Sequence, residues 1–357
     1  MPKSIFDLVT SKSVASYYET IESNRIPFLG EALFPADKKM GLKLEWIKGY
    51  DSLPIALMPS AFDTKPTLRD RGGVSTESTK MPFFREAMRL GEEDRQQLLM
   101  FAEANNSAYA QQAITRIFDD TKGLIDGAMI TPEIMRMKLL ANGAFSIASP
   151  ADSGVVVNYS YNYDPSGTWA GSNVTTLLTT AKWSDHVVSN PVLDIIAMKR
   201  KASQKGITLT RAILGYDTWL DIMLNEKIRL DLNPTAGQNV ILTDEMMKTY
   251  IENKTKIRFQ IYDKMYKDVN KTDQYFYPAA GQMTFLPEGA LGKTWYGTTP
   301  EEADLMSGNT LANVSIVNLG VAVSTEKIAL PVNIINWVSE IVLPSFENMG
   351  NVFNIKY

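Results

Sequence analysis

The stretch Gly41-Leu42-Lys43-Leu44-Glu45-Trp46-Ile47-Lys48-Gly49 decides the expected architecture. Apolar and charged residues alternate along it, which is the two-residue period of a strand with one buried face. A second short strand is predicted over 53–57, and residues 63–73 then show neither an apolar period nor a helix signal. Because a lone hairpin is marginally stable, we expect this charged-tipped excursion to be held by neighbouring chains.

A long helix is expected downstream, over residues 107–143. Apolar side chains recur there every three or four positions, which is the period of a helix with one buried face. Four of them are predicted to pack on a sheet, namely Ile114, Ile117, Leu124 and Ala128. Thr131-Pro132-Glu133 has the composition of a helix start, so the helix is expected to restart or bend there.

The other predicted elements mix helices and strands, which indicates the α+β class. An amphipathic helix is expected over 4–24, and Asn190-Pro191 caps a helix that ends at Gly206. Further helices are expected over 216–230 and 243–253, the latter capped by Thr243. The remaining strands are expected over 154–163, 207–214, 256–262, 314–319, 333–342 and 352–355.

Composition excludes several classes of chemistry. The 357 residues include no cysteine and one histidine, His186, and the formal net charge is −4. Thiol catalysis and zinc sites built from cysteine or several histidines are therefore excluded. His186 lies between polar stretches and is expected to be a loop residue, while the acidic balance disfavours direct nucleic-acid binding. No apolar stretch reaches the roughly 18 residues of a membrane span, and the N-terminus does not resemble a signal peptide.

Gly289-Ala290-Leu291-Gly292-Lys293-Thr294 has the ending of a phosphate-binding loop. The first glycine of that motif would fall on Pro287, which has no backbone N–H to offer a phosphate. No helix is predicted to open after Thr294, so we expect a glycine-rich turn and not a nucleotide-binding enzyme. The acidic clusters Glu92-Glu93-Asp94 and Asp119-Asp120 lack calcium-loop spacing. We therefore predict no catalytic residue, no cofactor and no metal site.

Several motifs follow one another in a recognisable order. Near the N-terminus these are Leu33-Phe34-Pro35, Gly41 to Gly49, Leu57-Met58-Pro59-Ser60-Ala61, Arg71-Gly72-Gly73 and Met81-Pro82-Phe83-Phe84-Arg85-Glu86. Near the C-terminus they are Ala329-Leu330-Pro331 and Val342-Leu343-Pro344-Ser345. Together with the helix over 107–143, they resemble the lambda-type tailed-phage major capsid protein family (capsid protein E) over essentially the whole chain. The resemblance rests on the order of the motifs and not on any single one.

The resemblance implies the tailed-phage major capsid fold, with an N-terminal arm, an extended loop, a long spine helix, a peripheral domain and an axial domain. The implied boundaries are 1–40 for the arm, 41–90 for the extended loop, 91–189 for the peripheral domain, 190–312 for the axial domain and 313–357 for C-terminal strands of the peripheral domain. The spine helix 107–143 and the strand 154–163 would belong to the peripheral domain.

The implied function is structural: a major capsid protein that self-assembles, as hexamers and pentamers, into the icosahedral head shell around the phage genome. DNA would be enclosed without sequence-specific binding and without a membrane, after assembly in the host cytoplasm. A portal and a separate scaffolding protein are expected as partners, the latter because the chain begins at Met1 with a short arm; a decoration protein is left open. The alternative is a cellular nanocompartment shell of the same fold.

Four charged residues lie at the predicted tip of the extended loop, namely Lys65, Arg69, Asp70 and Arg71. Charged contacts fix the register between partners more than they add affinity. We therefore predict that these residues contact a neighbouring subunit.

Overall fold

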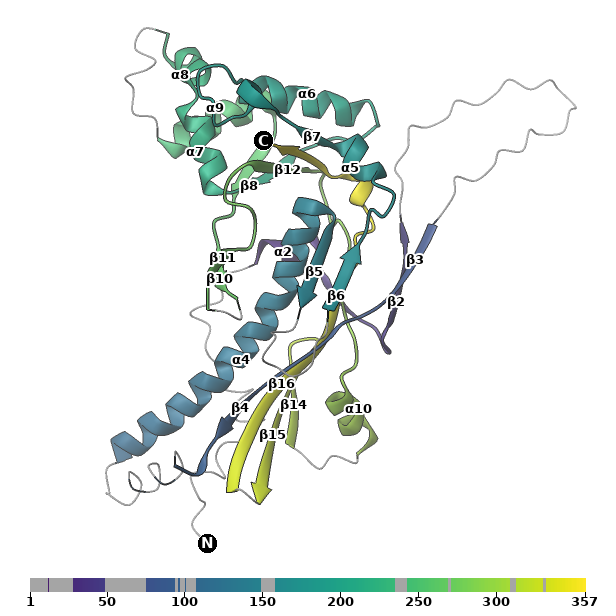
Figure 1. Ribbon diagram of the computed structural model, residues 1–357, viewed down its shortest axis with the longest axis vertical. Helices are drawn as coiled ribbons and strands as arrows, with labels where there is room; N and C mark the ends of the chain where they lie inside the picture. Colours follow the sequence, from purple (N-terminus) through teal and green to yellow (C-terminus); the bar gives the residue numbers. More distant parts are fainter. Residues whose placement is uncertain are drawn as a thin grey trace, which may run out of the picture. The chain divides into compact units, whose positions relative to one another are not determined.

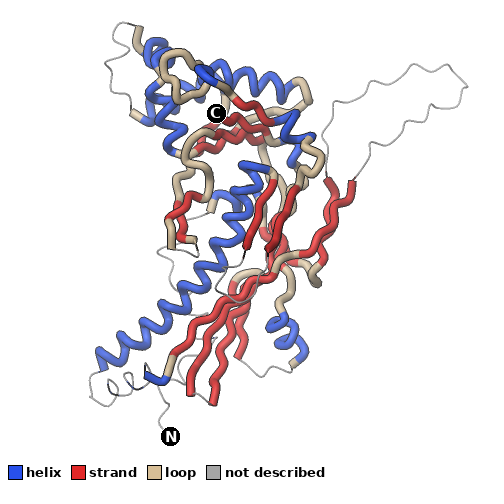
Figure 2. Tube along the Cα trace, in the orientation of Figure 1, coloured by secondary structure: helices blue, strands red, loops and turns tan. Residues whose placement is uncertain are grey.

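The structure is a computed structural model that describes residues 12, 28–48, 75–93, 96, 100, 107–148, 158–234, 243–268, 271–308, 313–329 and 332–357. Helices and strands both contribute, which confirms the predicted α+β class (Figures 1 and 2). The chain divides into two units. The first contains the described residues of Met1–Glu45, Ser78–Met135 and Lys293–Ser345, and the second contains those of Trp46–Glu77, Arg136–Gly292 and Phe346–Tyr357.

The first unit is built on a six-stranded sheet with the order β1-β13-β16-β15-β14, in which β4 also pairs with β16. The strands are β1 (Ala36–Lys38), β4 (Phe83–Leu90), β13 (Thr294–Tyr296), β14 (Asn313–Val317), β15 (Val321–Ala329) and β16 (Val332–Pro344). β16 has 13 residues, so it pairs with β15 along one edge and with both β4 and β13 along the other. Strands predicted over 314–319 and 333–342 are thereby confirmed.

Helix α4 (Ser107–Asn142) packs on this sheet through residues 121–129 (Figure 1). One core cluster joins helix side chains to strand side chains: Leu124, Ile125, Ala128, Val317, Val321, Val323, Ile334 and Val338. Inside the contact, Asn336 Nδ2 donates to Thr121 Oγ1 at 3.3 Å, which satisfies buried polar groups. The predicted packing of Leu124 and Ala128 is confirmed; the side chains of Ile114 and Ile117 lie outside the described residues.

α4 continues through Pro132 as one helix and does not restart there. Proline removes one backbone hydrogen bond, but the surrounding turn keeps other bonds. Thr131 Oγ1 donates to the Gly127 carbonyl at 3.0 Å, and the buried Glu133 accepts from Gly30 N at 3.0 Å. Tertiary contacts therefore hold a helix that its sequence weakens locally.

The described end of the predicted N-terminal arm, residues 28–40, is part of the first unit. It forms α2 (Leu29–Leu33) and β1, which pairs in parallel with β13. Phe34 is fully buried, and its carbonyl accepts from Thr294 Oγ1 at 2.9 Å. The helix predicted over 4–24 lies outside the described residues, apart from Lys12, which is helical.

The second unit has a five-stranded sheet with the order β7-β17-β12-β8-β9. Its strands are β7 (Val174–Thr176), β8 (Arg211–Leu214), β9 (Arg258–Ile261), β12 (Gln282–Leu286) and β17 (Phe353–Lys356). Its helices are α5 (Thr168–Asn173), α6 (Pro191–Ser203), α7 (Tyr216–Leu224), α8 (Glu226–Leu232) and α9 (Asp244–Thr255), and its 3-10 turns are Thr179–Ala181 and Met349–Asn351. Asn190 and Thr243 cap α6 and α9 as predicted, with side chains that accept from Leu193 N and Met246 N.

Helix packing on that sheet forms the larger core cluster, which includes Trp183, Trp219, Met247, Phe285 and Phe353. The end of α4 is fixed to the same sheet, since Gln282 Nε2 and Asn354 Nδ2 donate to the Ala141 carbonyl at 2.6 and 3.1 Å. These side chains satisfy carbonyl groups that the helix end leaves free. None of the helices in the described ranges is long and apolar enough to cross a membrane.

The partners of three strands could not be predicted from the sequence. β6 (Asn158–Asn162), the described part of the strand predicted over 154–163, pairs with β5 (Ala144–Ala148) and not with the C-terminal strands, because Tyr161 packs on Phe145 with ring centroids 5.1 Å apart. β17 pairs with β12 and β7, since Phe353 and Ile355 complete the second core. β13, placed in the 190–312 segment by sequence, pairs with β1 and β16 in the first unit.

Two small hairpins complete the fold. β10 (Met265–Lys267) pairs with β11 (Asp273–Tyr275), and β2 (Lys43–Lys48) pairs with β3 (Ser75–Lys80). In β2, Leu44 and Trp46 are buried as their alternation predicted, whereas Leu42, just before the strand, is 43% exposed. The strand predicted over 53–57 lies outside the described residues.

Candidate assembly surfaces

The predicted contact residues Lys65, Arg69, Asp70 and Arg71 lie outside the described residues, and the structure describes the base of their loop. β2 and β3, which flank residues 49–74 in the sequence, pair with each other. Trp46 anchors the base, with its ring stacked on Tyr163 at a centroid distance of 5.3 Å. On the exposed side Lys43 pairs with Glu45 at 2.7 Å, and that hydrogen bond lowers the pKa of Glu45.

The glycine-rich turn Gly289–Thr294 is held by contacts with protein groups. Arg211 donates to the carbonyls of Pro287 and Gly289 at 3.1 and 2.7 Å. Lys293 Nζ lies 2.7 Å from Asp37 Oδ2 and 5.1 Å from the centroid of the Trp295 ring. The hydrogen bond from Lys293 lowers the pKa of Asp37. The lysine that would bind a phosphate is thus paired with a carboxylate.

A helix does open after this turn, contrary to the sequence prediction. α10 (Pro300–Ser307) begins after Thr299, whose Oγ1 accepts from Glu302 N at 3.3 Å. The strand β13 stands between Thr294 and this helix, so the turn does not lead directly into a helix N-terminus. That direct junction is what places a phosphate on a helix dipole, and nucleotide binding is therefore not supported by the geometry.

Glu301, in the first turn of α10, is a buried carboxylate that sequence reasoning missed. Its Oε1 accepts from Trp337 Nε1 at 3.1 Å and pairs with Arg85, and its Oε2 accepts from Ser339 Oγ at 2.8 Å. Burial raises the pKa of Glu301, but the hydrogen bonds and the Arg85 charge outweigh burial and leave this pKa below its ordinary value. The neighbouring Glu302 pairs with Lys38 of β1.

These two ion pairs fasten α10 to the first-unit sheet. The order Thr299-Pro300-Glu301-Glu302 is itself a helix-start signal, because it places a capping threonine, a first-turn proline and two acids in sequence. That signal would have found the helix. The contact with Arg85 could not have been predicted from this local signal. Arg85 lies more than two hundred positions away and reaches Glu301 only through strand pairing between β4 and β16.

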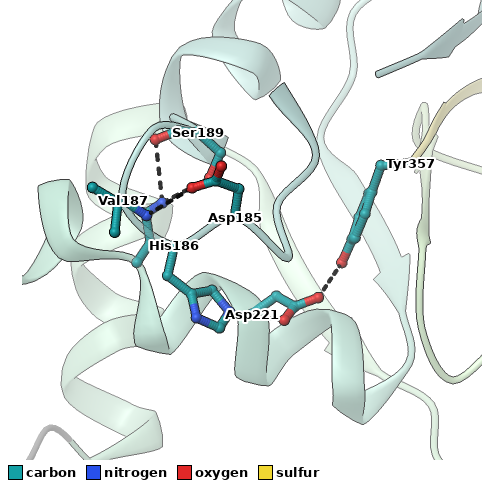
Figure 3. Close-up of polar contacts among 7 residues, drawn as sticks. Asp185, His186, Val187, Ser189, Asp221 and Tyr357 are labelled. Carbon is teal, nitrogen blue, oxygen red and sulfur yellow. Dashed lines mark hydrogen bonds and ion pairs between the residues drawn. The ribbon is translucent and has the colours of Figure 1, made fainter. Parts of the chain in front are cut away.

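His186 lies in a turn of the second unit, as predicted, and contacts a carboxylate (Figure 3). Its Nε2 is 3.0 Å from Asp221 Oδ1 on α7. The other Asp221 oxygen accepts from the hydroxyl of Tyr357 at 2.9 Å. Burial raises the pKa of Tyr357, so the phenol is a hydrogen-bond donor at neutral pH. Asp221 thus ties the turn to the C-terminal residue, which is a positioning arrangement.

The acidic clusters gather no metal site among the residues that the structure describes, where no three His, Cys, Asp or Glu side chains are placed to hold an ion. Glu92, Glu93 and Asp119 are exposed. Asp94 and the side chain of Asp120 lie outside the described residues.

Comparison with known proteins identifies the fold. The putative capsid protein of a prophage from E. coli CFT073 matches over 98% of this chain and 99% of that chain, with 14% identity and a TM-score of 0.58. A phage-related protein from Bordetella bronchiseptica RB50 matches over 98% and 97%, with 13% identity and a TM-score of 0.53. The capsid asymmetric unit of cyanophage A-1(L) matches over 92% of both chains, with 11% identity and a TM-score of 0.50. No curated protein matches the sequence.

The fold is therefore that of phage capsid proteins, as the sequence resemblance implied. The profile of the family described as phage major capsid protein E matches residues 10–318, which is well over half of the 357 residues. The chain belongs to the phage major capsid protein E family. It is a shell-forming structural protein of the virion.

Proposed function

We propose that copies of this chain associate as hexamers and pentamers into the closed head shell, and that the loop between β2 and β3 fastens neighbouring copies. The observation that carries the proposal is the anchored base of this loop. Leu44 is fully buried and Trp46 is stacked on Tyr163, while the chain between the paired strands carries Lys65, Arg69, Asp70 and Arg71. A loop with a buried base and charged residues between its strands can make polar contacts that set the register between subunits.

In this proposal the two units correspond to different domains of the shell subunit. The first unit, with the long β15–β16 hairpin and α4, supplies the peripheral domain and its spine. The part of the second unit that lies within 190–312, with α6 to α9, supplies the axial domain that gathers around the capsomer axes. The unit boundaries support this division because each unit has a sheet and a core cluster of its own.

The contents of the shell are phage DNA, held without sequence-specific binding and without catalysis by this chain. The formal net charge of −4 supports this, because a wall that carried a basic stripe would bind the phosphate backbone tightly. Assembly takes place in the host cytoplasm with a separate scaffolding protein and a portal. Purified particles that prove to contain DNA would favour this proposal. Particles that contain a cargo enzyme would favour the nanocompartment alternative.

The test replaces residues 62–73 by a short Gly-Ser linker in the full chain, expressed with the products of the neighbouring genes. We expect a folded subunit, judged by circular dichroism and melting, that forms no shells by electron microscopy. Single charge reversals at Lys65 or Arg69 are the matched controls, and they should still assemble, since exposed ion pairs contribute about 0.2–1 kcal/mol each. Normal shells from the linker variant would overturn the role of the loop.

A further inference from the structure

Trp46 of β2 is held by aromatic packing. Its indole stacks on the Tyr163 ring, with centroids 5.3 Å apart and an interplanar angle of 28°. Buried indole N–H groups usually find an acceptor, but Trp46 Nε1 is buried and has no hydrogen-bond partner in the part of the chain that the structure describes. Ring packing, and not a polar bond, therefore positions this indole.

The backbone of Tyr163 is bonded to the end of α4. Gly143 directly follows this helix, and its carbonyl accepts from Tyr163 N at 3.0 Å. Gly143 N in turn donates to the Leu139 carbonyl, in the last turn of α4, at 2.7 Å. Tyr163 thus contacts the helix end through its backbone and Trp46 through its ring.

The junction between α4 and β5 at Gly143 is closely packed. Gly143 has a φ of +68°, and an added Cβ would lie 2.5 Å from Met349 Cε and 3.0 Å from the Trp169 ring. Glycine alone adopts this conformation in this space without displacing its neighbours. The end of α4 and the strand that follows it therefore have one defined arrangement.

Further aromatic rings follow Tyr163 along the β5–β6 hairpin (Figure 1). The ring of Phe145 lies 6.5 Å from that of Tyr163 and 5.1 Å from that of Tyr161, and Tyr159 lies 6.3 Å beyond Tyr161. We define the aromatic row as these four rings and that of Trp46. Burial raises the pKa of Tyr161 and of Tyr163, so both phenols stay neutral near neutral pH.

We propose that Tyr163 is a positioning residue that couples the loop base to the end of α4. The loop base is defined as residues 46–48 of β2 and 75–77 of β3, which flank the loop 49–74. This inference rests on the proposed role of that loop in fastening neighbouring copies. A loop whose base keeps one orientation on the helix loses less conformational entropy when it meets a partner.

Two contacts form the path from the helix to the loop base, and both lie within the second unit. The Gly143 carbonyl is bonded to Tyr163 N, and the Tyr163 ring is stacked on the Trp46 ring. Because closely packed interiors transmit small displacements, a shift of the α4 end displaces Trp46 as well. Coupling measurements, and not proximity alone, test such a path.

The experiment measures amide hydrogen exchange of the unassembled full chain by mass spectrometry. Tyr163→Leu removes the ring and keeps the backbone bond, and Tyr159→Leu is the matched control at the far end of the aromatic row. The loop base should exchange about tenfold faster in Tyr163→Leu and at the wild-type rate in the control. Unchanged exchange in β8 and β12 shows that the unit stays folded. A loop base that exchanges at the wild-type rate in Tyr163→Leu, or equally fast in both variants, overturns the inference.

A second substitution tests transmission from the helix. Gln282→Ala removes the side chain that donates to the Ala141 carbonyl at 2.6 Å, near the end of α4. It should speed exchange of the loop base in the otherwise wild-type chain and add nothing in Tyr163→Leu, because non-additive effects mark coupled residues. Additive effects, or no effect of Gln282→Ala in the wild-type background, overturn the coupling. Failure of the wild type to form particles with its neighbouring gene products would instead count against the proposed function, while exchange in the unassembled subunit still decides on Tyr163.

Discussion

Replacing Glu301 by alanine removes one carboxylate that serves three donors at the start of α10. Ser339 is buried, and its hydroxyl donates to Glu301 Oε2 at 2.8 Å. The Trp337 indole donates to Oε1 at 3.1 Å, and Arg85 pairs with the same oxygen. The substitution leaves these donors without their acceptor, so we expect α10 to loosen from β16 and β4 and the first unit to lose stability.

The free energy of unfolding lost on substitution depends on how exposed each of the three donors is. A buried hydroxyl left unsatisfied costs about 1–3 kcal/mol, and the half-buried indole N–H adds about 1 kcal/mol. The Arg85 side chain is 47% exposed and can turn to water, so its share is under about 1 kcal/mol. We therefore expect Glu301→Ala to lower the free energy of unfolding by about 2–5 kcal/mol, and Glu301→Gln, which keeps the shape and one acceptor, by about 1–2 kcal/mol.

Urea unfolding of the unassembled subunit, followed by tryptophan fluorescence, measures this free energy. Asp304→Ala is the matched control, because Asp304 is an exposed acid on the same helix and should change stability by less than about 0.5 kcal/mol. A Glu301→Ala variant within that margin of the wild type would refute the assignment of Glu301 as the anchor of α10.

The pH dependence of the free energy of unfolding provides a second test of Glu301. The pKa of Glu301 is lowered from its ordinary value of 4.5, so its stabilising contribution is complete above that pH and is lost as the pH falls through the folded-state pKa. The stability difference between the wild type and Glu301→Gln should therefore be constant near neutral pH and shrink in acid. A difference that grew on acidification would contradict the sign of the shift.

Three further predictions concern other parts of the chain. Leu124→Ala should destabilise the first unit by about 2–4 kcal/mol in urea unfolding, because Leu124 is 6% exposed between α4 and the sheet; a loss below about 1 kcal/mol would contradict the packing. Gly127→Ala should stabilise α4 by about 1 kcal/mol, since an added Cβ meets nothing within 4 Å. We further predict that α4 bends at this glycine between the precursor and the mature shell, so that the stiffer variant favours one of these two states; equal α4 curvature by cryo-microscopy before and after genome packaging would exclude such a bend. Lys293→Ala should leave assembly unchanged, and Mg-ATP should not raise the melting temperature of the wild type; a reproducible rise would contradict this, because a ligand at a hundred times its Kd stabilises by about 2.7 kcal/mol.

The roles of the loop-tip residues remain predictions. Lys65, Arg69, Asp70 and Arg71 lie outside the described residues, and their contact with a neighbouring subunit stays a prediction. The structure adds which apolar side chains of its helices stay exposed, among them Leu193 and Ile196 on α6 and Leu220 on α7. The sequence predicted a helix that ends at Gly206 and one helix over 216–230, which the structure divides at Asn225 into α7 and α8. It gave no measure of which apolar residues stay exposed, since burial depends on what packs above each helix face.

The sequence by itself determined the elements whose signals are local. The alternation in 43–48 and the capping residues Asn190 and Thr243 act within a few positions, so they are readable without the fold. The long helix over 107–142 was readable for the same reason, because a repeat of three to four residues recurs along it.

Only the tertiary structure decided which strands share a sheet and which carboxylates are satisfied. β17 joins the second unit although its sequence neighbour β16 belongs to the first, and β1 enters a sheet beside a strand more than 250 positions away. Likewise, Arg85 and Glu301 meet only because β4 pairs with β16. Strand pairing and burial depend on the free energy of the whole packed chain, and a local pattern does not contain the contacts that distant segments make.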